Sequence, residues 1–97
     1  MSNYVLVFTS KSENEFIDSA IYYETKQKGL GYKFSESVNE ILNSISKNPF
    51  AYQRKYKHYR EAVLKVFPFT VIYEIKDNEI IINAIFHTKR NPKKKIK

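Results

Sequence analysis

The most informative stretch for the fold is residues 69–86, which read Phe-Thr-Val-Ile-Tyr-Glu-Ile-Lys-Asp-Asn-Glu-Ile-Ile-Ile-Asn-Ala-Ile-Phe. Side chains in residues 69–75 alternate in character, the period expected of a β-strand. Asp77 and Asn78 both tolerate a positive φ, which predicts a two-residue hairpin turn. Residues 80–86 are largely apolar on both faces, which predicts a third strand in the middle of the sheet.

The strongest helical pattern lies upstream of this hairpin. Apolar side chains recur at helical spacing over residues 34–45, as Phe34, Val38, Ile41, Leu42 and Ile45. Asn48-Pro49 ends this helix, because proline disfavours a helical backbone in the residue before it.

An earlier helix begins near residue 11. Ser10 with Glu13, or Ser12 with Glu15, has the spacing of a capping box. Gly29-Leu30-Gly31 holds both glycines of the chain and predicts a tight connection between antiparallel helices, with Gly29 as a left-handed C-cap.

Two further apolar runs complete the set of strands. Residues 4–8 and 62–67 are both predicted as strands, and Pro68 turns the chain after the second. The expected order is β-α-α-β-β-β, an α+β fold with a helical hairpin packed on a twisted, mainly antiparallel sheet. Residues 1–92 form one domain, and residues 93–97 form a basic flexible tail.

The 97 residues carry a net charge of +7, unevenly distributed. Residues 1–50 hold five Lys/Arg and six Asp/Glu, whereas residues 51–97 hold twelve and four. This asymmetry indicates a basic surface that attracts phosphate or an acidic protein segment; the alternative is a merely solubilising surface. The chain has no cysteine, no signal-peptide pattern and no apolar run long enough to span a bilayer. We therefore expect a cytoplasmic protein that is not inserted in a membrane.

Two segments in the basic half are candidates for function. Residues 52–60 read Tyr-Gln-Arg-Lys-Tyr-Lys-His-Tyr-Arg, and cations with aromatic rings suit phosphates and unpaired bases. The alternative is a solvated connector or a short helical turn. Residues 87–95 follow a central strand, where His87 and Arg90 are well placed for function. The candidate nucleic-acid contacts are Arg54, Lys55, Lys57, Tyr59 and Lys89.

No metal site or cofactor is expected. The two histidines are far apart in sequence without a carboxylate cluster, and no phosphate-loop, dinucleotide or nucleophile-elbow motif is present.

Residues 4–92 resemble the RelE/ParE superfamily of bacterial toxins, also known as plasmid stabilisation proteins. Four pieces carry the resemblance, and their order and spacing make it specific. They are Ala20-Ile21-Tyr22-Tyr23-Glu24; Gly29-Leu30-Gly31 with Phe34; Asn48-Pro49 and Tyr52 with Tyr59-Arg60-Glu61-Ala62-Val63-Leu64 and Phe67-Pro68-Phe69; and Ile72-Tyr73-Glu74-Ile75 with residues 85–92.

The resemblance implies the toxin of a type II toxin–antitoxin module, held inactive by a cognate, often acidic, antitoxin. RelE-type members cleave mRNA in the ribosomal A site as metal-independent mRNA interferases. ParE-type members instead inhibit DNA gyrase. A non-toxic RNA-binding module and a degenerate member that binds only an antitoxin are the further alternatives.

For RNA cleavage, the resemblance implies Arg90, Lys65 and Arg60 as phosphate-binding catalytic residues, with His87 or Tyr59 as proton carrier. Arg60 has a structural alternative, as a bridge between strand and helix. The chain departs from RNA-cleaving members in having one cation in residues 62–66 and no aromatic residue after Arg90. The expected function is growth inhibition by ribosome-dependent mRNA cleavage, and because of these departures ParE-type inhibition of DNA gyrase is kept as the alternative.

Overall fold

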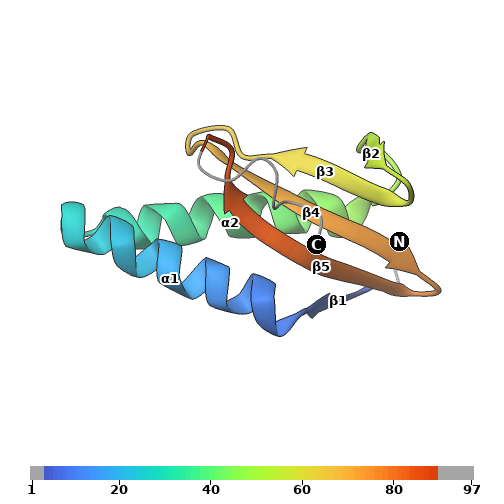
Figure 1. The fold of residues 1–97 in the computed structure, drawn as a ribbon, viewed down its shortest axis with the longest axis horizontal. Helices are drawn as coiled ribbons and strands as arrows, with labels where there is room; N and C mark the ends of the chain where they lie inside the picture. The colour runs from blue at the N-terminus through green and yellow to red at the C-terminus, as the bar shows by residue number, and fades with distance from the viewer. Residues whose placement is uncertain (1–3, 90–97) are drawn as a thin grey trace.

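The computed structural model describes residues 4–89, and it confirms the α+β fold with two helices on one face of a mixed sheet (Figure 1). The elements are β1 (Val5–Phe8), α1 (Ser10–Lys26), α2 (Leu30–Lys47), β2 (Arg54–Tyr56), β3 (Tyr59–Val63), β4 (Phe69–Lys76) and β5 (Glu79–His87). The strand order across the sheet is β1-β5-β4-β3-β2. β1 runs parallel to β5, and the other pairs are antiparallel.

The core lies between the sheet and the helical hairpin. The α2 stripe predicted from the sequence is confirmed, because Phe34, Val38 and Ile45 are fully buried. Phe34 packs edge-on against Phe69, with ring centres 4.8 Å apart, and Tyr23 of α1 packs against Phe67 at 4.9 Å. Aromatic pairs of this geometry add to the free energy of area burial.

The helical hairpin depends on both glycines. Gly29 adopts a left-handed φ of 88° immediately before α2, although the C-cap of α1 is Gln27 and not Gly29. Gly31 lies where the helices touch, since an added Cβ would come within 2.6 Å of the carbonyl oxygen of Ala20. The close crossing therefore requires a residue without a side chain at position 31.

Helix α1 begins within one residue of its predicted start, but its predicted cap and the predicted bounds of the strand at residues 62–67 are wrong. Helix α1 is capped by Thr9, whose hydroxyl accepts from the Ser12 N–H at 3.1 Å, and not by Ser10 or Ser12. The strand expected at residues 62–67 is β3, which begins at Tyr59 and ends at Val63. A tight loop replaces its second half, because the Phe69 carbonyl accepts from Leu64 N and Phe69 N donates to the Phe67 carbonyl.

The alternative of a solvated connector or helical turn for residues 52–60 is wrong, because most of this segment lies in the β2–β3 hairpin, residues 54–63. Tyr56 pairs with Tyr59 across a two-residue turn. Lys57 takes a φ of 51° in that turn, a conformation more usual for glycine or asparagine. The turn therefore has no strong local signal, and pairing with β3 decides the conformation.

A β-bulge explains why β5 is apolar on both faces. Tyr73 pairs with Ile82 and Ile72 with Ala84, so Asn83 has no direct partner on β4. The bulge reverses the alternation of side chains. Ile80, Ile82 and then Ile85 thus belong to the core cluster beneath the helices.

Candidate functional site

Arg60 extends from β3 toward the connector between α2 and β2. Its Nη1 donates to the carbonyl oxygens of Tyr52 at 2.6 Å and Phe50 at 3.4 Å. The guanidinium also lies 5.1 Å from the centre of the Phe50 ring, a cation–π contact. These contacts hold Arg60 against the connector, which comprises residues 48–53.

Tyr73 of β4 holds the same connector from the core side. Its hydroxyl donates to the Pro49 carbonyl at 2.6 Å. Burial raises the pKa of Tyr73 to about 12, against the opposing effect of the nearby Arg60 charge. The phenol therefore stays protonated near neutral pH and remains a hydrogen-bond donor.

Lys65 is exposed just beyond β3, at the rim of a cleft of about 140 Å³. The cleft lies between α2 and the end of β3, and Ser37, Glu40, Ile41, Ser44, Tyr52 and Leu64 form the rest of its lining. Ser44 Oγ and Tyr52 Oη lie 2.7 Å apart within it. The cleft mixes apolar and hydroxyl groups with one charge of each sign.

His87 ends β5 and lies in a different environment. Its ring packs edge-on against Phe69 at 5.3 Å, and its Nδ1 accepts from the Lys89 N–H at 3.1 Å. The cleft beside it, about 210 Å³, is also lined by Glu15 and Asp18 of α1. Asp18 adds a negative charge to this cleft and Glu15 is already paired with Lys11, so the lining does not favour phosphate.

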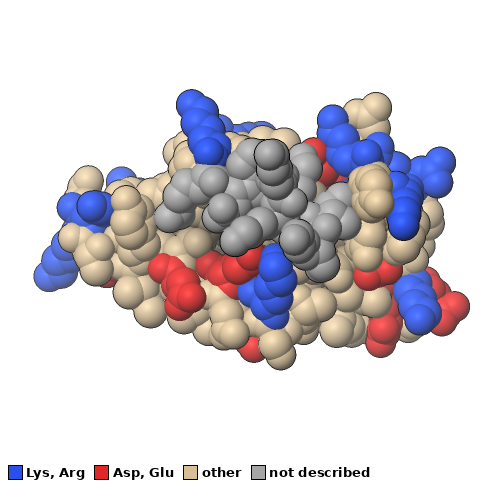
Figure 2. Space-filling view, in the orientation of Figure 1, with Lys and Arg blue, Asp and Glu red and all other residues tan. Residues whose placement is uncertain are grey.

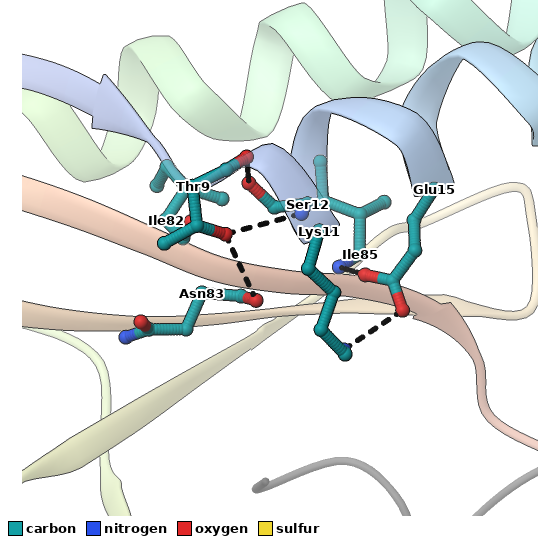
Figure 3. A network of polar contacts seen from close by, with 7 residues as sticks. All are labelled: Thr9, Lys11, Ser12, Glu15, Ile82, Asn83 and Ile85. Atoms are coloured by element: carbon teal, nitrogen blue, oxygen red, sulfur yellow. Dashed lines mark hydrogen bonds and ion pairs between the residues drawn. The ribbon is translucent and has the colours of Figure 1, made fainter.

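Glu15 also completes the edge of β5. Strand β1 pairs with β5 only as far as Ile82, and Glu15 Oε1 accepts from the Ile85 N–H at 2.9 Å, beyond the end of β1. Lys11 Nζ donates to the other carboxylate oxygen at 2.9 Å (Figure 3). This carboxylate therefore replaces a strand partner that β1 does not supply.

The basic hairpin, residues 54–59, presents cations to solvent. Arg54, Lys55 and Lys57 are all exposed, and Lys57 Nζ lies 5.3 Å from the centre of the Tyr56 ring. The turn is tied to the sheet by His58, whose Nε2 lies 2.9 Å from Glu74 Oε1. The Tyr59 ring lies beside the His58 ring at 4.4 Å, so it is only partly available for base stacking.

The predicted site residues do not gather at one place. The hairpin turn lies beside Glu74 in β4, whereas His87 pairs with Phe69 at the other end of that strand. Five residues along a strand span roughly 17 Å. Lys89 is therefore remote from Arg54, Lys55 and Lys57. Lys65 and His87 lie at the same end of the sheet, on opposite sides of β4, and they line different clefts. Arg90 lies outside the described residues.

Two polar groupings had not been identified from the sequence as sites. One is the Glu15, Asp18 and Ser19 wall beside His87. The other is Glu74, which also accepts from Asn83 Nδ2 at 3.0 Å. The sequence gives only a weak indication of either grouping, because the residues that contact each other are up to 70 positions apart in the chain.

Among residues 4–89, no three His, Cys, Asp or Glu side chains are placed to hold a metal ion together. None of the helices in this range has the length and apolar character needed to cross a bilayer.

The family model described as the ParE toxin of the type II toxin–antitoxin system parDE matches residues 4–92. A solved structure, the chromosomal ParDE system from P. aeruginosa, has a chain with a TM-score of 0.74 and 18% identity. The match covers 87% of this chain and 95% of that one, and at this identity it establishes a shared fold.

No curated protein sequence matches the chain significantly. The family model nevertheless spans nearly all of the chain, and the fold agrees with it. The chain therefore belongs to the ParE toxin family of type II toxin–antitoxin systems, within the RelE/ParE superfamily.

Proposed function

We propose that this toxin arrests growth by binding and inhibiting DNA gyrase, and that it does not cleave mRNA. The observation that carries the proposal is the placement of Arg60, whose guanidinium is engaged by two backbone carbonyls and an aromatic ring. These contacts fix the guanidinium against the connector between α2 and β2, which supports a structural role for Arg60 in place of phosphate binding.

The other described candidates support the same proposal. Metal-independent RNA cleavage needs a phosphate-binding cation and a proton carrier within hydrogen-bond reach of one scissile phosphate. Here His87 lines a cleft with Glu15 and Asp18, while Lys65 lines a separate cleft beside α2. A toxin that acts by binding a protein needs no such convergence.

We also propose that a cognate antitoxin neutralises the chain. The similar solved structure is a ParDE system, in which the toxin belongs to a toxin–antitoxin pair. A net charge of +7 favours an acidic partner segment by long-range attraction. Residues 4–92, matched by the toxin family, form the domain on which such a partner acts.

The test compares the two mechanisms directly. The full chain would be induced in bacteria without antitoxin, and incorporation of labelled thymidine and amino acids would be followed. We expect DNA synthesis to fall first. Purified chain should inhibit supercoiling by DNA gyrase and should leave mRNA uncut in a programmed translation extract.

Arg90→Ala is the matched variant, since the family resemblance gives that residue the main catalytic role. Early loss of protein synthesis with mRNA cut in the A site, both relieved by Arg90→Ala, would overturn the gyrase mechanism. It would establish the mRNA interferase instead. Absence of any growth effect from abundant soluble chain would favour a non-toxic binding module.

A further inference from the structure

Positive charge in the described part of the chain is concentrated at the basic hairpin. Residues 48–60 contain four Lys/Arg and no Asp/Glu, whereas the rest of residues 4–89 contains eight Lys/Arg and ten Asp/Glu. Arg54, Lys55 and Lys57 are all exposed, and Figure 2 shows Lys and Arg side chains gathered over β2. This margin of the sheet therefore attracts anions locally.

The carboxylates nearest the hairpin are engaged within the sheet. Glu74 Oε1 lies 2.9 Å from His58 Nε2, and Glu74 Oε2 accepts from Asn83 Nδ2 at 3.0 Å. Glu61 accepts from the Thr70 hydroxyl at 3.0 Å. Among residues 4–89, no carboxylate forms an ion pair with any of the three exposed cations of the hairpin. Their charge is therefore available to an external anion.

These cations lie on both faces of the sheet margin. Arg60 pairs with Tyr73, whose side chain is fully buried in the core, and Arg54 pairs with Arg60. Residues directly opposite in an antiparallel pair share a face, so Arg54 lies on the helix side. Tyr56 pairs with the residue before Arg60 and so lies on the other side, where Lys57 Nζ is 5.3 Å from its ring centre. Cations on both faces can reach phosphates on the two strands that border a DNA groove.

The aromatic rings of this region are each covered on one side. Lys57 lies over the Tyr56 ring, and the Arg60 guanidinium lies 5.1 Å from the centre of the Phe50 ring. The Tyr59 ring lies 4.4 Å from that of the neighbouring histidine. Proteins bind unpaired bases by stacking them on open aromatic faces. The surface is therefore better suited to the phosphates of a duplex, whose bases remain stacked on one another.

The backbone of the hairpin is held in place by the domain itself. The Glu61 N–H donates to the Gln53 carbonyl at 3.2 Å, beside the pairing of β2 with β3. The contact of His58 with Glu74 ties the turn to β4. Fixed attachment points for the cations reduce the conformational entropy that binding must offset.

An acidic protein segment suits this surface less well than a nucleic acid. Protein interfaces are centred on side chains buried in apolar pockets. Neither of the two clefts described above is lined by a residue of the basic hairpin. Binding to a phosphate backbone needs no such pocket, because it depends on charge.

We propose that the basic hairpin binds the phosphate backbone of duplex DNA, with Arg54 on the helix side of β2, Lys57 on the other side and Lys55 between them in the chain. The choice of DNA rests on the proposed action on gyrase, an enzyme whose substrate is duplex DNA. The toxin thus contacts the enzyme and its DNA together. Phosphate contacts of this kind position a protein without reading base sequence.

The test measures binding of the full chain to a fluorescent duplex of about 20 base pairs by anisotropy, over a range of salt concentrations. The hairpin variant combines Arg54→Gln, Lys55→Gln and Lys57→Gln, since glutamine removes the charge and keeps much of the side-chain length. We expect its dissociation constant to be about tenfold higher than that of the wild type near 0.1 M salt. The slope of log affinity against log salt should fall by up to about 3 units, roughly 0.9 for each lost phosphate contact.

The matched control combines Lys26→Gln, Lys28→Gln and Lys33→Gln. These exposed lysines lie where α1 is joined to α2, at the opposite end of the molecule from β2 (Figure 1). Their loss lowers the net charge by the same amount. We expect the dissociation constant to change by about twofold or less, because salt screens charges at that distance. Thermal unfolding establishes that both variants are folded.

Tyr56→Leu distinguishes a duplex from unpaired bases. It removes the exposed ring and leaves the three cations in place. We expect the wild type to prefer the duplex to oligouridine of the same length, and Tyr56→Leu to change duplex affinity by about twofold or less. A preference for oligouridine that is lost in Tyr56→Leu would assign the hairpin to single strands and overturn the inference.

Equal duplex affinity of the wild type and the hairpin variant would overturn this inference alone, whatever the toxin does to gyrase. In the supercoiling assay, severalfold more of the hairpin variant should be needed for the same inhibition. A wild-type chain that binds the duplex through the hairpin but leaves supercoiling unchanged would overturn the gyrase mechanism and retain the DNA-binding surface.

Discussion

Two side chains of the sheet and one of the connector itself hold the connector between α2 and β2 in place. Arg60 and Tyr73 bind its carbonyl oxygens from two neighbouring strands, and Tyr52 contacts Ser44 of α2. A loop carries backbone polar groups that must be satisfied when it packs on the core. These side chains supply the hydrogen bonds that a helix or sheet would otherwise provide.

Arg60→Ala should therefore reduce the free energy of unfolding by about 1–3 kcal/mol, because it leaves two carbonyl oxygens without their charged donor. Urea denaturation measures this change. Arg54→Ala, an exposed arginine on the neighbouring strand, should shift stability by less than about 0.5 kcal/mol. A stable Arg60→Ala protein that has lost toxicity would instead indicate a direct role at the target.

Tyr73 makes stability depend on alkaline pH. Its folded pKa of about 12 lies above the ordinary value of 10.0, because burial disfavours the phenolate. The folded state therefore holds the proton more tightly, so this contribution is complete below about pH 10 and is lost as pH rises toward 12.

Unfolding free energies of the wild type and Tyr73→Phe, measured across that pH window, provide the test. The wild type should lose stability more steeply with rising pH, since Tyr73→Phe has no proton to lose at this position. Equal slopes for the two proteins would mean that Tyr73 ionises as readily in the folded chain as in the unfolded one.

Hydrogen bonds join the start of α1 to strand β5, which lies more than 70 residues further along the chain. Thr9 caps the helix through Ser12 N, and its hydroxyl also points at the Ile82 and Asn83 carbonyls of β5, at 3.2 and 3.4 Å (Figure 3). The cap and the bulge of β5 are thus adjacent. The Thr9 side chain therefore stabilises both the first turn of α1 and its contact with β5.

Thr9→Ala should reduce the free energy of unfolding by about 1–2 kcal/mol, the usual cost of a lost N-cap. Ser10→Ala is the matched control, because Ser10 is exposed and already inside the helix; it should have little effect. Thermal unfolding of both variants measures the difference. A larger effect at Ser10 would restore the capping box expected from the sequence.

For the molecule as a whole, most of the net positive charge lies in the last eight residues of the sequence. Residues 4–89 contain twelve Lys/Arg and ten Asp/Glu, whereas residues 90–97 contain five Lys/Arg and no acid. Residues 4–89 by themselves are therefore nearly balanced in charge. Its cations matter through their local placement at the margin of β2 and β3.

Ending the chain after Pro92 removes four lysines. Binding to polyuridine should then weaken, and the slope of log affinity against log salt should fall by up to about 3 units. Alanine at Arg54, Lys55 and Lys57 together removes three cations from the hairpin and provides the comparison. An unchanged slope for the shortened chain would show that its lysines do not contact the polyanion.

The helices, the β4–β5 hairpin and their order were all predictable from the chain. Each depends on side chains a few residues apart: the apolar stripe of α2, the alternation of β4, the stop at Pro49 and the Asp77-Asn78 turn. Local backbone sterics and binary patterning determine such elements before any tertiary contact forms. The family resemblance likewise follows from short motifs in a fixed order.

The basic hairpin, the bulge at Asn83 and the roles of the site residues required the tertiary structure. Lys57 turns the chain without the usual turn residues. Arg60 donates to the Phe50 and Tyr52 carbonyls of the connector, a contact that its position in the sequence does not show. Glu15 meets Ile85 across 70 residues of sequence. Such contacts are decided by strand register, and register is set by pairing between segments that are distant in the chain.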